Sequence, residues 1–182
     1  MSDGARVIVG VSGSLHSLTA LHRAADEARD RGAVLVPVLA WTPAGGEYNY
    51  RLRPCPPLLR AWQALADARM DQALEEAFGG LPAGVRVEPL VVRGEVGPVL
   101  TALADRPDDL LVVGAGRHGT LRTTVRRLFQ GGSVSRYCLA RARCTVLAVP
   151  PSDLQADLRA LRRGVDLREL DGLVAARAAR AA

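Results

Sequence analysis

The sequence predicts an α/β protein: a single doubly wound (Rossmann-like), five-stranded, mostly parallel sheet with helices on both faces, plus a C-terminal helical tail. Five short apolar runs alternate with segments of helical periodicity. The runs lack the polar alternation of half-exposed strands, which favours strands buried on both faces. A length of 182 residues with 48% hydrophobic content suits one sizeable core. We expect residues 1–151 to form the α/β domain and residues 152–182 the tail.

The first strand and helix are well marked. Residues 6–11 (RVIVGV) form an apolar run, and Ser14 can cap a helix over 15–31, which Gly32 ends. A second apolar run covers 33–41. Its Pro37 has no N–H group, so we expect a locally unpaired side or a bulge there.

The following residues, 42–57, contain four prolines and two glycines and lose all periodicity, which predicts a long surface loop. The remaining elements follow in alternation. We expect helices over 58–78, 94–103 and 133–142, and strands over 85–92, 109–115 and 145–149.

Composition limits the partners. The net charge is +5, but the chain has no lysine, which indicates the coding bias of a GC-rich genome rather than a nucleic-acid partner. Only 4% of residues are aromatic, too few for a base-stacking platform. There is no apolar run of membrane-spanning length and no signal peptide, so we expect a cytoplasmic protein without membrane contact. The three cysteines lack metal-ligand spacing and are interpreted as half-buried core residues.

A glycine-rich segment, 112–135, carries the chemical signal. Its glycines follow a buried strand and recur before a helix, where close backbone approach and free N–H groups suit a phosphate. Arginines, His118 and the hydroxyls of Ser133 and Ser135 add donors. The alternative is that the glycines only turn the chain, Ser133 caps the helix and the arginines are solvated.

At these motifs the sequence resembles the universal stress protein family across residues 5–150. The resemblance rests on RVIVGVSGS with the helix and strand after it, on DLLVVGAGRHG, and on GGSVSRYCLARARCTVLAV. It implies the α/β fold and a nucleotide, ATP, as ligand. The residues that it implies are Gly10, Val11, Ser12 and Ala40 near adenine, and Gly114, Gly116, His118, Gly119, Gly132, Ser133, Val134 and Ser135 near ribose and phosphates.

The sequence departs from the family pattern at two points. Twelve residues separate Gly119 from Gly132, where the family has nine, which lengthens the phosphate loop. Anchoring the motif on Gly114 instead would put Arg117 at the second glycine. Ser12 stands where the family usually has an acid, and since serine is a poor magnesium ligand, metal-assisted binding is not expected.

Three functional interpretations remain open. The first is a nucleotide-binding stress-response regulatory protein without dedicated catalysis, because no catalytic triad, carboxylate pair or metal cluster can be placed at the site. The second is a dimeric interaction module that has lost nucleotide binding. The third is a weak ATPase. The family resemblance implies a homodimer through strand 145–149, and the amphipathic tail is interpreted as packing or dimer-contact helices, with a partner-binding helix as the alternative.

Overall fold

The computed structural model describes residues 4–115, 134–150 and 152. Contacts divide the chain into two units, Met1–Pro150 and Pro151–Ala182. All helices and strands described below belong to the first unit. The expected helical tail lies outside the described residues, apart from Ser152.

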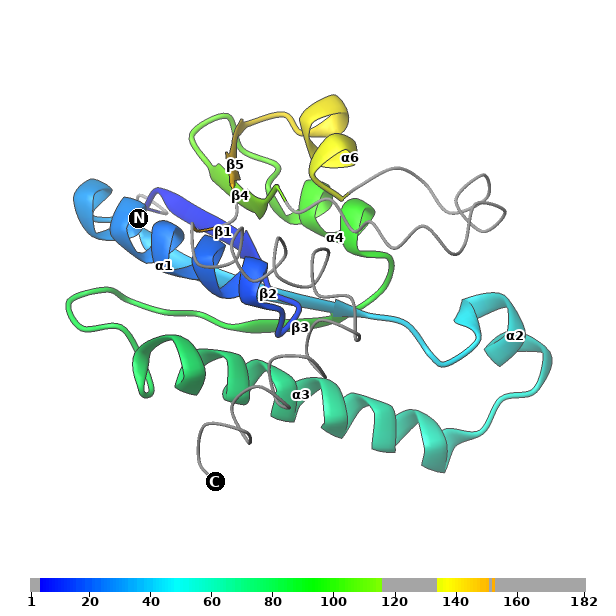
Figure 1. The fold of residues 1–182 in the computed structure, drawn as a ribbon. Coiled ribbons are helices and arrows are strands. Elements are labelled where there is room, and N and C mark those ends of the chain that lie inside the picture. Colours follow the sequence, from blue (N-terminus) through cyan, green and yellow to red (C-terminus); the bar gives the residue numbers. More distant parts are fainter. Residues whose placement is uncertain (1–3, 116–133, 151, 153–182) are drawn as a thin grey trace, which may run out of the picture. The chain divides into compact units, whose positions relative to one another are not determined.

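The sheet is five-stranded and parallel in every pairing, as predicted, with the order β3-β2-β1-β4-β5 (Figure 1). Its strands are β1 (Arg6–Gly10), β2 (Val34–Trp41), β3 (Leu90–Arg93), β4 (Leu110–Gly114) and β5 (Thr145–Val149). Since β1 pairs with β2 on one side and with β4 on the other, the chain winds outward in both directions from the centre. The doubly wound topology is confirmed.

Helices cover both faces of the sheet (Figure 1). On one face, α1 (Leu15–Arg31) and α3 (Pro56–Phe78) bury alanines and leucines against Val7 and Val9 of β1. On the other, α4 (Val96–Leu103) and α6 (Val134–Arg141) pack against Ile8 of β1. The alternation of Val7, Ile8 and Val9 between two core clusters explains why this strand is apolar throughout.

Capping residues set the limits of α1, as predicted. The Ser14 side chain accepts a hydrogen bond from the backbone N–H of Ser17, at 3.4 Å. At the other end, Gly32 adopts a left-handed conformation with φ of 58°, which favours glycine. Both signals are local in sequence, so the bounds of this helix could be read from it.

Pro37 interrupts the pairing between β2 and β3, which confirms the expected unpaired side. Leu35 donates its N–H to Arg86 and accepts from Glu88, both at 2.9 Å. In this register the next backbone N–H to face β3 would be that of residue 37, which proline lacks. The strand predicted over 85–92 is therefore shorter, with continuous pairing only from Leu90 to Arg93 after an isolated bridge at Val87.

The prediction of an unstructured loop over 42–57 is wrong in its centre, where a short helix, α2, spans Gly46–Leu52. Contacts distant in sequence stabilise it. Arg93, at the end of β3, donates two hydrogen bonds of 2.7 Å to the carboxylate of Glu47 in the first turn. No local pattern predicts this pair.

The cysteines differ in exposure. Cys138 is fully buried in α6, and burial raises the pKa of its thiol to about 11. Cys144 is half-buried, whereas Cys55 is exposed, so the core interpretation is wrong for Cys55. In the part of the chain that the structure describes, no helix is long and apolar enough to cross a bilayer.

Candidate functional site

A cleft of about 400 Å³ opens at the carboxyl ends of β1, β2 and β4. Because the strands are parallel, their carboxyl ends share one edge of the sheet, and β1 lies where the winding direction reverses. Open α/β sheets bind ligands at such a position. Six of the residues singled out in the sequence line this cleft: Gly10, Val11, Ser12, Ala40, Gly114 and Val134.

The walls of the cleft are mainly apolar. Val11 and Leu39 come from the strand ends on one side, and Leu100 and Val113 from α4 and β4 on the other. Gly10 leaves little room behind it, because a Cβ atom there would lie 3.0 Å from a methyl carbon of Leu100. The volume lies in the range of small-molecule sites, and the apolar walls suit the face of a flat ring.

Three serines provide hydroxyl groups at one end of the cleft. The hydroxyls of Ser12 and Ser14 lie 3.0 Å apart, and Ser17 donates its hydroxyl to the Ser14 carbonyl at 2.8 Å. Ser14 and Ser17 thus hold the first turn of α1 in place. Ser12 is exposed and stands directly after the strand end. It can offer a donor or an acceptor to a bound molecule.

Six of the predicted site residues are not among those that line the cleft, and five of these six lie outside the described residues. Ser135 is buried within α6 and is not part of the cleft wall. Gly116, His118, Gly119, Gly132 and Ser133 lie outside the described residues. Their assignment to phosphate binding stays a prediction.

The structure adds lining residues that the sequence analysis did not identify. Trp41, the last residue of β2, and Thr42 after it extend the cleft, and Val96 contributes from α4. The indole N–H of Trp41 donates to Gln63 of α3 at 3.1 Å, which fixes the ring. The most distant addition is Arg69, from the middle of α3. It belongs to no motif, so only the packing of α3 could reveal it.

A second cavity, of about 360 Å³, adjoins the first and shares Ser12 and Arg69 with it. The second cavity is also lined by Gly13, Ala73 and the polar side chains of Gln72 and Glu76. Among the described residues, no group of three or more histidine, cysteine or acidic side chains is placed to hold a metal ion.

Comparison with known proteins assigns the family. Residues 5–150 match a model of the universal stress protein family. A universal stress protein solved in complex with cAMP is 29% identical, with a TM-score of 0.51, and the match covers 83% of this chain and 100% of that one.

Two further structures share the fold at lower identity. The universal stress protein UspA from Lactobacillus plantarum has 19% identity and a TM-score of 0.53, over 82% of this chain and 99% of that one. A universal stress protein from Archaeoglobus fulgidus has 21% identity and a TM-score of 0.53, and the match covers 80% of this chain and 93% of that one. No curated protein matches the chain. The family match over most of the chain shows that this protein belongs to the universal stress protein family.

Proposed function

We propose that this protein is a stress-response regulator that binds an adenine nucleotide, ATP, in the cleft at the carboxyl ends of β1, β2 and β4, without dedicated catalysis. One observation carries the proposal: residues from three separate strands, Gly10, Ala40 and Gly114 among them, line one largely apolar cavity at the switch point of the sheet. The 29% identical universal stress protein in complex with cAMP supports an adenine nucleotide as ligand.

Within this proposal, the adenine lies against Gly10, Val11 and Ala40, and the ribose and phosphates extend toward Gly114 and Val134. The family resemblance adds Gly116, His118, Gly119, Gly132, Ser133 and Ser135 to the phosphate end. Ser12 offers a hydroxyl to the ribose or base. A neutral serine gives a magnesium ion little to bind, so we propose that ATP binds without a protein-held metal.

The absence of catalysis is part of the proposal. Among the described residues that line the cleft, none is a carboxylate or an imidazole, and the only charged side chain is Arg69. General acid and base groups would be needed within hydrogen-bond reach of a reacting phosphate or water. We therefore propose ligand binding, with weak ATP hydrolysis as the alternative that a turnover assay would detect.

Titration calorimetry with ATP tests the binding site. Ala40→Leu adds a side chain that fills the cleft, and we expect ATP affinity to fall at least about tenfold, because overfilling a packed site costs about 1–3 kcal/mol. Ala61→Leu is the matched control, since Ala61 is exposed on α3 outside the cleft. No binding by the wild type at millimolar ATP would refute the nucleotide proposal, whereas equal binding by Ala40→Leu would refute its location.

The edge of β5 favours a second function, a homodimeric interaction module. In the described structure β5 pairs only with β4. Ala115 donates its N–H to the carbonyl of Val149 at 2.7 Å, so the backbone groups of Val149 and Leu147 face β4. Those of Val146 and Ala148 face away from the sheet. We propose that this edge pairs with its copy in a second subunit, which would cover an open strand edge.

Ala148→Pro tests the dimer edge. Proline removes one outward-facing N–H and leaves every hydrogen bond to β4 in place, so the variant should fold but dimerise more weakly. Light scattering after size exclusion should show a dimer for the wild type and a shift toward monomer for Ala148→Pro. Ala148→Val, which keeps the N–H, should stay dimeric. A monomeric wild type, or a proline variant as dimeric as the wild type, would contradict this edge.

A further inference from the structure

Arg69 is the cation that the two adjoining cavities share. It lies in the middle of α3, where Ala66, Met70 and Ala73 are buried in the core. Their burial fixes the rotation of the helix and brings the intervening Arg69 to the carboxyl end of β1 beside Ser12. The side chain of Arg69 is exposed, so its guanidinium can reach a molecule that enters the cleft.

The neighbours of Arg69 on α3 do not neutralise it. Helical side chains meet at spacings of three and four, and the residues at those spacings are Leu65, Ala66, Gln72 and Ala73. None is acidic. No hydrogen bond or ion pair joins Arg69 to another described residue. By contrast, Arg23 and Arg31 of α1 both pair with Glu27 at the spacing of four.

Glu76, whose carboxylate is the one that lines the second cavity among the described residues, forms no ion pair with Arg69. Glu76 accepts a hydrogen bond of 2.7 Å from the side-chain amide of Gln72. The first cavity contains no described carboxylate. Arg69 is thus the one described cation that lines the joined cavities, it has no ion-pair partner among the described residues, and its planar fork fits phosphate oxygens. A neutral ligand would make no use of its charge.

We propose that Arg69 is an anion-binding residue of this cleft, contacting a phosphate oxygen of the bound nucleotide where the two cavities meet beside Ser12. The proposal rests on nucleotide binding as proposed above, and it adds a residue: one phosphate of the chain that extends toward Gly114 and Val134 also contacts Arg69, which lines the same cavity. The ligand class is an adenosine phosphate, and adenosine itself lacks the group that Arg69 binds.

Calorimetry with two ligands tests this role. Arg69→Gln keeps a polar side chain but removes the charge, and we expect ATP affinity to fall about tenfold while adenosine affinity is unchanged, because a charge-assisted hydrogen bond is lost. Raising the salt concentration should weaken ATP binding to the wild type more than to Arg69→Gln. The matched control is Arg60→Gln, also exposed on α3 but lining neither cavity.

The outcomes separate the two proposals. If Arg69→Gln loses no more ATP affinity than Arg60→Gln, or loses adenosine affinity equally, then Arg69 does not bind the phosphate, and nucleotide binding itself stands. If the wild type binds neither ATP nor adenosine, both proposals fall. Arg69→Lys should retain part of the ATP affinity, since lysine keeps the charge but not the fork.

Discussion

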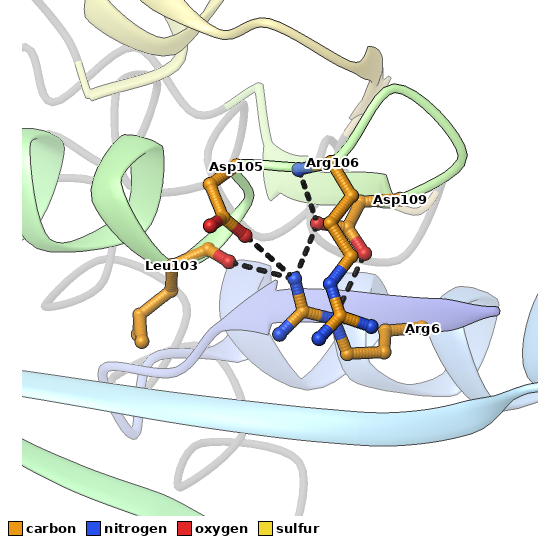
Figure 2. Close-up of polar contacts among 5 residues, drawn as sticks. All are labelled: Arg6, Leu103, Asp105, Arg106 and Asp109. Atoms are coloured by element: carbon orange, nitrogen blue, oxygen red, sulfur yellow. Dashed lines mark hydrogen bonds and ion pairs between the residues drawn. The ribbon is translucent and has the colours of Figure 1, made fainter. Parts of the chain in front are cut away.

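Replacing Asp109 with alanine should lower the free energy of unfolding by about 3–5 kcal/mol, because it leaves Arg6 partly buried without its main partner. Asp109 is only 2% exposed at the start of β4. Arg6, the first residue of β1, donates from Nε to one of its carboxylate oxygens at 2.9 Å and from Nη2 to the other at 2.7 Å (Figure 2). The pair ties the central strand β1 to its neighbour β4 at their amino ends.

Further hydrogen bonds complete this cluster (Figure 2). The backbone N–H of Arg106 donates to Asp109 at 3.1 Å, and Nη2 of Arg6 donates to the carbonyl of Leu103, the last residue of α4, at 3.1 Å. Loss of Asp109 would thus remove a hydrogen bond to the backbone as well as both of its hydrogen bonds to the guanidinium. The hydrogen bond to Asp109 is the main cause that raises the pKa of Arg6.

Asp105 provides the matched control, because it binds the same Nη2 of Arg6 at 2.9 Å but its side chain is 63% exposed. Arg6 lowers the pKa of Asp105, so its contribution is present at neutral pH and is lost as pH falls through that lowered pKa. Water screens an exposed pair, so Asp105→Ala should cost far less than Asp109→Ala. Urea denaturation of both variants at pH 7 would measure the difference, and equal losses would contradict the role of burial.

This cluster shows what sequence patterns can and cannot predict. The apolar run that follows Asp109 predicted β4, because the burial of a strand leaves a local pattern in the sequence. The burial of the Asp109 carboxylate left no such pattern, because its partner Arg6 lies 103 residues away in the sequence. The helix α2 was missed for the same reason: Glu47 and Arg93 are 46 residues apart.

The residues of the candidate site also differ in whether the sequence could predict them. Gly10, Ala40 and Gly114 could be assigned to one cleft because the ends of parallel strands meet at one edge of a sheet. Arg69 could not, because its place depends on how the buried residues of α3 orient the helix. Its sequence context is an ordinary helical stretch.

Replacing Gly97 with alanine should destabilise the protein by about 1–3 kcal/mol, the cost of overpacking. Gly97 is buried in the first turn of α4, and an added Cβ would lie 2.7 Å from Cδ1 and 2.9 Å from Cγ of Tyr137 in α6. Both ring atoms lie close to the α6 backbone, so the two helices would have to separate. Helix propensity alone favours alanine over glycine by up to about 1 kcal/mol, so the sign of the change shows which effect is larger.

A double-mutant cycle isolates this contact. Tyr137→Ala removes the ring, and in that background Gly97→Ala should cost less or become stabilising. Gly4→Ala is the control, because a Cβ at Gly4 meets nothing within 4 Å. An equal cost of Gly97→Ala in both backgrounds would contradict the steric explanation.

The contact between Gly97 and Tyr137 also bears on the cleft. Val96 and Leu100 of α4 and Val134 of α6 line the same cavity, so separating the two helices would move two of its walls apart. A looser fit loses contacts with a bound base. Gly97→Ala should therefore weaken ATP binding even at temperatures where the variant is fully folded. Restored ATP affinity in the double variant Gly97→Ala/Tyr137→Ala would link the spacing of α4 and α6 to binding, whereas unchanged affinity in Gly97→Ala would show that the cleft tolerates the movement.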